Sequence, residues 1–313
     1  MDAAVKKALD TKTFRPTGRG GGGSISSGSS YITDDGTVFV KINEKSNALT
    51  MFEGERAGLE AILATETIRC PKPIAIVKDG SNVALVMENL NMTSMTSHQQ
   101  EILGEQLARM HLHNKMIVDE MHKGESRITT GSGDEDSSIK VVRKFGFSVP
   151  TCCGYISQDN TWQEDWTVFY LRQKLQAQVD RILRKAGDRD LNDVWSLCCQ
   201  KIETQLSKLA NIVPALVHGD LWSGNVASSE SVPVIYDPAS FYGHSEFDFG
   251  IARMFGGFSP SFYNAYFKIN PKTDGFSERQ DIYELFHHLN HWNHFGIGYK
   301  GSTISLLKKI STS

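Results

Sequence analysis

The sequence predicts an α+β protein with two lobes, a small β-rich N-terminal lobe (residues 1–90) and a larger helical C-terminal lobe (residues 91–313). Short apolar runs separated by turn residues are concentrated before position 90, whereas helical periodicity dominates after it. Mostly polar residues from 91 to 100 mark a linker between the two parts. A chain of 313 residues is long enough to bury a core in each lobe.

The composition excludes several classes of protein. A hydrophobic content of 40% and a charged content of 22% are those of an ordinary globular protein. The formal net charge of −3 gives no basic footprint, so nucleic acid is not an expected partner. We expect no membrane association, because the chain has no run of about 18 apolar residues and its N-terminus lacks the apolar core of a signal peptide.

The five cysteines are expected to be reduced thiols. Four of them form adjacent pairs, Cys152 with Cys153 and Cys198 with Cys199, and the fifth is Cys70. An odd number and adjacent pairs do not resemble a disulfide framework, and the spacing is not the C-x-x-C of a zinc site. These observations favour a cytoplasmic enzyme.

A glycine-serine stretch near the N-terminus is a candidate phosphate-binding loop. Every position from 20 to 28 except Ile25 is Gly or Ser, and strands are predicted at 29–33 and 37–42 around a hairpin turn. Such a loop lets backbone N–H groups approach phosphate oxygens without obstruction by side chains. It matches neither G-x-G-x-x-G nor the G-K-[ST] of a Walker motif, so a flexible linker is the alternative.

A charge pair is predicted between Lys41 and Glu55. Lys41 lies inside an apolar strand, and Glu55 shares a helical stripe with the apolar residues around it. An inward glutamate is costly unless it is paired, and the lysine of the neighbouring strand is the natural partner. Kinases hold the nucleotide phosphates with such a strand lysine and helix glutamate. Glu53 lies off the stripe and is expected to be solvated; a surface lysine with a half-exposed glutamate is the alternative.

The segment that ends the N-terminal lobe is a candidate site for a nucleotide base. Two further strands are predicted at 71–77 and 82–87. The residues that follow directly are Glu88, Asn89 and Leu90. A base would form hydrogen bonds there with exposed backbone between the lobes. Met87 would lie deepest against the base, with a place in the core as the alternative.

The most specific chemical motif lies between two short apolar strands of the C-terminal lobe. Asp220 and Asn225 have four residues between them, which is the spacing of the kinase catalytic loop H-R-D-x-x-x-x-N. In that loop the aspartate accepts the proton of the attacking hydroxyl, and the asparagine holds magnesium. Asp237, at the end of the next strand, matches the metal-binding aspartate of D-F-G. Each residue alone would be read as a turn former, but the three offsets together favour phosphoryl transfer.

The chain beyond Asp237 favours a small acceptor molecule. A helix is predicted to begin near Ser245, only a few residues further on. No room remains for a long activation loop, and no A-P-E motif is present, which argues against a protein kinase. Glu246 and Asp248 are predicted either to orient the catalytic loop or line the substrate cleft, or to be surface caps.

Other parts of the C-terminal lobe are predicted to be structural. Helices are expected at 99–114, within 162–186 and within 191–210. His111 and His113 are expected to be structural, and the polar loop at 124–138 to carry no chemistry. One aromatic stripe is expected to face the core: Trp162, Trp166, Phe169, Tyr170 and Leu175.

Three histidines near the C-terminus share one face of a predicted helix, at i, i+4 and i+7: His287, His291 and His294. Zinc coordination is one interpretation, although no H-E-x-x-H motif or nearby acidic ligand supports it. A hydrogen-bonding wall for a polyhydroxyl substrate, with Trp292 stacking on the sugar, is the second interpretation. Buried core histidines are the third.

Together these stretches resemble the fructosamine-3-kinase and ketosamine-3-kinase family over essentially the whole chain. The resemblance is carried by residues 21–26 (GGGSIS), 38–41, 51–55 (MFEGE), 86–88, 145–147, 151–155 (TCCGY), 162–166 (WQEDW), 218–225 (HGDLWSGN), 237–246 (DPASFYGHSE) and 289–296 (LNHWNHFG). Several of these matches are long, so the resemblance is specific.

The resemblance implies a bilobal protein-kinase-like fold of the aminoglycoside-phosphotransferase type. It also implies ATP-dependent phosphorylation, with Mg²⁺, of the sugar 3-hydroxyl of ketosamines. These are Amadori adducts such as ribulosamine, psicosamine or fructosamine on protein lysines or small amines. The phosphorylated adduct then decomposes and frees the amine, so glycated proteins or small ketosamines are the expected partners of a deglycation enzyme. The chain is expected to be a monomer or a homodimer.

The family pattern and the motifs assign a role to each candidate residue. Asp220 accepts the hydroxyl proton, Asn225 and Asp237 hold Mg²⁺, and Lys41, set by Glu55, grips the phosphates. The loop residues expected at the phosphates are Gly22, Gly23, Ser24, Ile25 and Ser26. The residues expected at the adenine are Met87, Glu88, Asn89 and Leu90. The residues expected at the sugar are Trp222, His291 and Trp292.

One departure and three rival functions accompany this interpretation. Many relatives carry cysteine where this chain has Ser24, so the thiol switch or disulfide-linked dimer that the resemblance would suggest is not available through this loop. The first rival is a phosphotransferase for another alcohol, such as an aminoglycoside, choline or homoserine. The second is a nucleotide-binding pseudokinase, and the third is a protein kinase acting on serine. The sequence does not predict which ketosamine is preferred.

Overall fold

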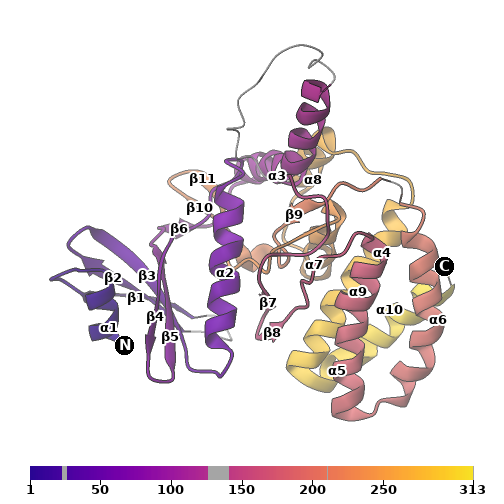
Figure 1. The fold of residues 1–313 in the computed structure, drawn as a ribbon, viewed down its shortest axis with the longest axis horizontal. Coiled ribbons are helices and arrows are strands. Elements are labelled where there is room, and N and C mark those ends of the chain that lie inside the picture. The colour runs from indigo at the N-terminus through magenta and orange to yellow at the C-terminus, as the bar shows by residue number, and fades with distance from the viewer. Residues whose placement is uncertain (23–26, 126–140, 210, 313) are drawn as a thin grey trace.

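The computed structural model describes residues 1–22, 27–125, 141–209 and 211–312 (Figure 1). Four residues of the predicted phosphate loop therefore lie outside the described residues: Gly23, Ser24, Ile25 and Ser26. So does most of the polar loop predicted at 124–138, whose first two positions instead end a long helix.

The N-terminal part is an antiparallel sheet between two helices (Figure 1). Among the described residues its strand order is β1-β2-β3-β5-β4. The strands are β1 (Arg15–Gly22), β2 (Ser27–Thr33), β3 (Gly36–Asn43), β4 (Pro73–Asp79) and β5 (Asn82–Glu88). Side chains alternate across β5, so Leu85 packs with helix α2 (Ala48–Leu63) while Val86 packs with helix α1 (Asp2–Ala8). The strands predicted around the two hairpin turns are confirmed.

Part of the glycine-rich stretch is strand rather than loop. Gly21 pairs with Gly28, and Gly22 pairs with Ser27, across β1 and β2. Glycine has a low intrinsic preference for strands, but the ladder between β2 and β3 continues through this pairing. The prediction of a loop over 20–28 is therefore wrong at its two ends.

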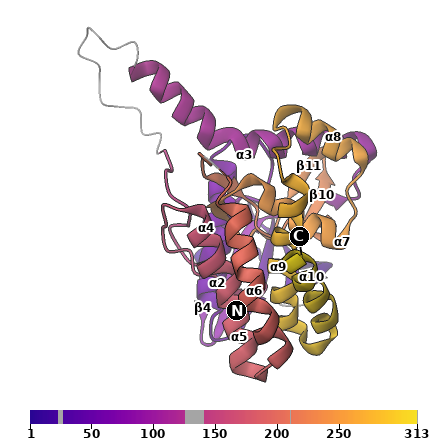
Figure 2. The same ribbon diagram turned by 90° about the vertical axis from the view of Figure 1, so that its right-hand side faces the viewer.

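The remainder of the chain is mostly helical, with short strand pairs (Figure 2). The longer helices are α3 (Ser97–Glu125), α5 (Ala177–Ala186), α6 (Arg189–Leu206), α7 (Asp248–Phe255), α8 (Pro260–Ile269), α9 (Phe276–Phe295) and α10 (Lys300–Thr312). A short helix α4 (Trp166–Val168) and a π-helical stretch (Phe169–Gln176) precede α5. Single 3₁₀ turns lie at Ser223–Asn225, Ser245–Phe247 and Gly296–Tyr299. The short strands are β6 (Met92–Thr93), β7 (Cys152–Cys153), β8 (Ile156–Ser157), β9 (Ala215–Val217), β10 (Val226–Ser229), β11 (Val232–Ile235) and β12 (Phe241–Gly243).

Helix α9 is the centre of the C-terminal part. It packs against α5, α7 and α10 (Figure 2). Its buried residues lie on all sides of the helix rather than on one stripe. The aromatic residues predicted for the core are buried at Trp166, Phe169 and Tyr170, whereas Trp162 is exposed. The rings of Trp166 and Tyr170 pack on α9 through Tyr283.

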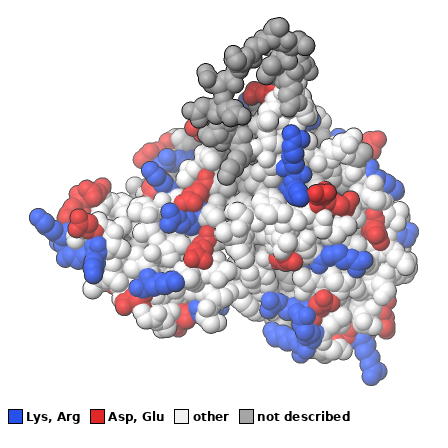
Figure 3. Space-filling model, viewed as in Figure 1, with Lys and Arg blue, Asp and Glu red and all other residues white. Residues whose placement is uncertain are grey.

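Strand β6 lies just beyond the predicted lobe boundary and pairs with β10. The chain therefore joins the C-terminal part directly after residue 90, while the boundary itself stays a prediction. In the described ranges, every helix is too short or too polar to cross a membrane. Figure 3 shows acidic and basic side chains interspersed on the face that it displays.

Candidate active site

Lys41 links the two parts of the protein. Its Nζ donates hydrogen bonds to both carboxylate oxygens of Glu55, at 2.8 and 2.9 Å, and to Oδ1 of Asp237 at 2.9 Å. Burial alone would lower the pKa of Lys41, but the charges of Asp237 and Glu55 raise it overall, so the ammonium form is stable. The predicted pair of Lys41 with Glu55 is confirmed, and Glu53 is exposed as expected.

Asp237 combines an exposed carboxylate with an unusual backbone conformation. Its side chain is 45% exposed, and its φ angle is +58°, in the left-handed region that non-glycine residues seldom adopt. Such a conformation persists only where surrounding contacts fix it. One fixing contact follows two residues later, where the amide of Ala239 donates to the carbonyl of His218 at 2.9 Å. The end of the strand and the loop at 218–225 are thereby held together.

Asp220 and Asn225 are in direct contact. Nδ2 of Asn225 donates to the main-chain oxygen of Asp220 at 2.9 Å and to its Oδ2 at 3.2 Å. Burial and the negative charge of Asp237 raise the pKa of Asp220 to about 7, against the opposing effect of the Asn225 hydrogen bond. A carboxylate with a pKa near the working pH is suited to accept a proton.

Asp248 fixes the backbone that carries Asp220. Its Oδ2 accepts from the amide of His218 and its Oδ1 from the amide of Gly219, both at 2.8 Å. Nε2 of His111 lies 3.0 Å from the same Oδ2. Asp248 is 0% exposed, so of the alternatives that the sequence left open it orients the loop. His111 is structural, as predicted, through this contact.

Glu246 has a different partner. Arg279 donates to both of its carboxylate oxygens, at 2.8 and 2.7 Å, and both side chains are buried. The surface cap that the sequence also allowed for Glu246 is therefore wrong. The pair joins the 3₁₀ turn Ser245–Phe247, which precedes α7, to α9.

The predicted adenine site lies at the end of β5. Met87 is 4% exposed and packs in the core on the α2 side, which was the alternative for this residue. The carboxylate of Glu88 pairs with Arg69 at 2.7 Å, and Oδ1 of Asn89 accepts from the hydroxyl of Ser30 at 2.6 Å. These contacts fix the segment, whereas adenine binding by Glu88, Asn89 and Leu90 stays a prediction.

Two of the three predicted sugar contacts share an aromatic group. The rings of Trp222 and His291 both pack against Phe255, at centroid distances of 5.4 and 5.2 Å. Trp292 is instead 6% exposed and belongs to the hydrophobic core. This burial gives no support to the predicted stacking of Trp292 on a sugar, which stays a prediction.

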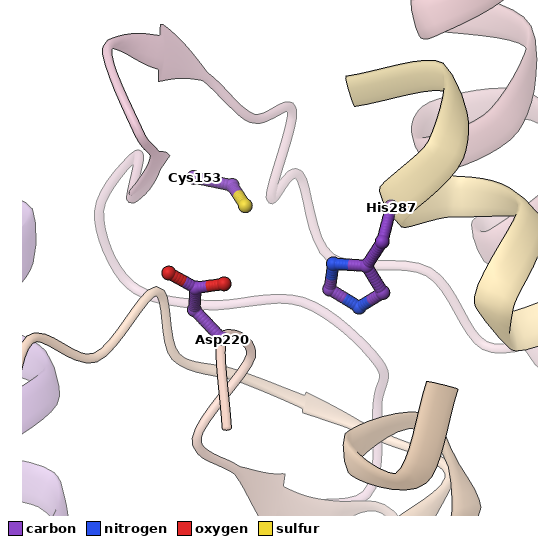
Figure 4. A group of neighbouring side chains, drawn as sticks. All are labelled: Cys153, Asp220 and His287. Atoms are coloured by element: carbon purple, nitrogen blue, oxygen red, sulfur yellow. The ribbon is translucent and has the colours of Figure 1, made fainter. Parts of the chain in front are cut away.

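The three histidines of α9 do not share one ligand site among the described residues. Nδ1 of His291 lies 2.8 Å from the carbonyl of His287, and Nδ1 of His294 lies 2.7 Å from that of Asn290. His287 is 0% exposed and faces Asp220 and Cys153 rather than the other histidines (Figure 4). Burial lowers the pKa of His287 well below its usual value, so the imidazole is neutral.

Cys153 beside Asp220 is a neighbour that sequence reasoning did not assign, and His287 was considered only together with His291 and His294. Cys153 was expected to be one of five reduced thiols, and all five cysteines, each within the described residues, do carry free thiols. The only sequence indication was the match at 151–155, which gave no role to this thiol.

Comparison with known proteins identifies the family. The sequence model of the fructosamine kinase family matches residues 2–125 and 134–313. The chain belongs to the fructosamine kinase family. It is 50% identical to the ketosamine-3-kinase of Mus musculus over 99% of this chain and 100% of that protein. It is 40% identical to a chloroplastic protein-ribulosamine 3-kinase of Arabidopsis thaliana over 92% of this chain and 80% of the relative.

Solved structures show the fold of this fructosamine kinase family member. A crystal structure from Haemophilus somnus, assigned as a fructosamine-3-kinase, has a TM-score of 0.78 at 24% identity and covers 99% of this chain and 96% of its own. An aminoglycoside phosphotransferase has a TM-score of 0.62 at 11% identity and covers 100% and 99%. The bilobal protein-kinase-like fold is confirmed. As a family member, the chain is an ATP-dependent phosphotransferase, as predicted.

Proposed function

We propose that this enzyme transfers a phosphoryl group from Mg-ATP to the 3-hydroxyl of ketosamines, such as ribulosamine, psicosamine or fructosamine on protein lysines or small amines. The observation that carries the proposal is the ionic contact of Lys41 with Glu55 and Asp237. The charge of Asp237 acts on Asp220, which is paired with Asn225. The ketosamine substrate class is supported by the names of the most similar relatives.

Asp220 is the proposed base for the acceptor hydroxyl. Its carboxylate is held by the hydrogen bond from Asn225, and its backbone is fixed by Asp248. A pKa of about 7 leaves a large share of the carboxylate ionised at neutral pH and still basic enough to accept the proton. Proton transfer of this kind contributes about 10²–10⁴-fold to a rate.

Asn225 and Asp237 are the proposed ligands of Mg²⁺, and their chemistry fits the ion. Carboxylate and amide oxygens are the donors that Mg²⁺ prefers. Asn225 donates through Nδ2 to Asp220, which leaves its amide oxygen available for a cation, and the carboxylate of Asp237 is exposed enough for a hydrated ion to reach it. A magnesium ion held there would neutralise charge on the transferring phosphates.

Lys41 is the proposed phosphate contact, and Glu55 fixes its position. The glycine-rich residues 22–26 would cover the phosphates, and residues 88–90 would hold the adenine. Trp222 and His291 are the proposed sugar contacts, since they lie in one aromatic group on Phe255. Phosphorylation of an Amadori adduct would make it decompose and free the amine, so the proposed role is deglycation. The five free thiols support a reducing compartment such as the cytoplasm.

A panel of acceptors tests the proposal. The enzyme is incubated with Mg-ATP and lysine carrying ribulosamine, psicosamine or fructosamine, and in parallel with an aminoglycoside, choline, homoserine and a serine peptide. Mass spectrometry is expected to find one added phosphoryl group on at least one ketosamine, and NMR to place it on the C3 oxygen. Phosphorylation of the aminoglycoside or choline, with none of any ketosamine, would overturn the substrate class.

A further inference from the structure

Three side chains of different chemistry meet beside the proposed base. The ligand atoms of Cys153, Asp220 and His287 all lie within 4.8 Å of one another. Cys153 comes from β7, Asp220 from the loop after β9, and His287 from the middle of α9. Figure 4 shows the three side chains directed toward one shared space.

His287 indicates that this space receives a ligand. The side chain is 0% exposed, yet neither ring nitrogen has a hydrogen-bond partner among the described residues. A buried polar group without a partner costs about 1–3 kcal/mol. The ring packs against Phe247 and Phe286, which offer no hydrogen bonds to satisfy it. A nitrogen lone pair is therefore directed at the thiol and the carboxylate without serving any contact of the fold.

The thiol is held in place as metal ligands usually are. Nδ2 of Asn290 lies 3.1 Å from Sγ of Cys153 and donates to it. Oδ1 of Asn290 in turn accepts from Nε2 of Gln178 at 3.1 Å, and both amides are buried. Supporting hydrogen bonds of this kind orient ligands and tune their affinity for metals. Burial and the charge of Asp220 raise the pKa of the Cys153 thiol well above its usual value, so the thiol is protonated until a cation replaces the proton.

We propose that Cys153, Asp220 and His287 form an inhibitory binding site for a thiophilic divalent cation, with Zn²⁺ as the best match. Zinc binds thiolate at about 2.3 Å and imidazole or carboxylate at about 2.0–2.2 Å, with three protein ligands and one open position in a tetrahedral site. Ligand atoms in such a site are about 3.3–3.8 Å apart, so side-chain rotations of the order of an ångström close the present group around the ion. On binding, the thiol proton leaves to solvent and a zinc–sulfur bond forms, without any redox change.

This site differs from the proposed magnesium site in its donors. Asn225 and Asp237 offer oxygen only, whereas Cys153 and His287 offer sulfur and nitrogen, which magnesium avoids and zinc prefers. The inhibitory effect rests on the proposed function, because a zinc-bound carboxylate of Asp220 can no longer accept the proton of an acceptor hydroxyl. Inhibition is therefore expected to be competitive with the acceptor and not with ATP.

Cobalt provides a direct binding test that does not depend on activity. Co²⁺ added to the metal-free wild-type protein is expected to give a thiolate-to-cobalt charge-transfer band and intense visible bands of tetrahedral coordination. Cys153→Ser should lose the charge-transfer band. Cys152→Ser is the matched control, because Cys152 is the adjacent thiol and lies outside the group, and it should retain the band. His287→Asn should keep the thiolate band but require more than about tenfold higher cobalt concentration.

Zinc inhibition is the second measurement. Rates are taken at fixed Mg-ATP in buffered free Zn²⁺, each normalised to the zinc-free rate of the same variant. The zinc concentration for half inhibition should rise more than about tenfold in Cys153→Ser and stay unchanged in Cys152→Ser. Absence of the cobalt band in the wild-type protein, or equal zinc sensitivity of Cys153→Ser and wild type, overturns the site. If cobalt binds through Cys153 but no ketosamine is phosphorylated, the metal site stands and the proposed function fails.

Discussion

Replacing Asp248 by asparagine should dislodge the loop that carries Asp220. Each carboxylate oxygen of Asp248 accepts a backbone N–H at 2.8 Å, one from His218 and one from Gly219. An asparagine side chain supplies one acceptor and one donor, so either orientation of its amide sets an NH₂ group against a backbone N–H. The contact with His111 weakens as well, since the charge of the carboxylate is lost.

The size of the effect follows from these contacts. Hydrogen bonds to a charged group contribute about 1.5–3 kcal/mol each, and breaking a buried charged contact by changing one partner costs about 3–5 kcal/mol. We expect the free energy of unfolding of Asp248→Asn to fall by about 3–5 kcal/mol. A displacement of Asp220 by about 1 Å would lower kcat by about 100-fold.

Urea unfolding and initial rates measure the two effects. Asp193→Asn is the matched control, because Asp193 lies exposed on α6. This substitution should change the unfolding free energy by less than about 0.5 kcal/mol. If Asp248→Asn unfolds at the wild-type urea concentration and keeps the wild-type kcat, Asp248 does not hold the loop.

Three further substitutions test other parts of the structure. Glu55→Gln should lower kcat/KM for Mg-ATP by up to about 100-fold, because Lys41 loses its charged partner on α2; the exposed Glu53→Gln is the control, and equal losses would refute the pairing. Gly219→Ala should destabilise the fold by about 1–3 kcal/mol, since its φ is +85° and a Cβ would overlap the carbonyl oxygen of Ala239; Gly301→Ala, in open space on α10, should not destabilise it. Burial lowers the pKa of His244 to about 3, so between pH 6.5 and 3 the unfolded chain binds a proton that the folded chain does not. The free energy of unfolding therefore falls as pH falls through this window, and His244 contributes about 1.4 kcal/mol per pH unit to that fall. In urea unfolding measured at a series of pH values, His244→Asn should remove this contribution to the pH dependence, whereas the exposed His98→Asn should leave the pH dependence unchanged.

The parts of the site that the sequence predicted depend on local spacing. Glu55 lies on the apolar stripe of its helix, and four residues separate Asp220 from Asn225. Both arrangements are found in the structure, because each depends only on residues that are a few positions apart in the sequence. The contact of Lys41 with Asp237 joins residues far apart in the sequence, so it could be predicted only by assuming a kinase-like arrangement of these local patterns.

Contacts set by long-range packing could not be predicted in this way. Trp292 is buried because α9 is enclosed by other helices, and a helix that is buried on all sides has no polar face to indicate where a given side chain points. The approach of His287 to Cys153 joins α9 to a two-residue strand, which no periodicity reveals. The strand at Gly21 and Gly22 likewise depends on pairing with β2 rather than on its own composition.

Asp220→Asn tests the central claim most directly, namely that Asp220 accepts the acceptor proton beside a nucleotide held by Lys41 and Asp237. The variant keeps the shape of the side chain but removes the base. The decisive measurement is the initial rate of phosphoryl transfer to ribulosamine-bearing lysine, with ATP affinity determined by calorimetry on the same samples. We predict a loss of about 10²–10⁴-fold in kcat with ATP affinity close to that of the wild type. A kcat near the wild-type value would contradict the account.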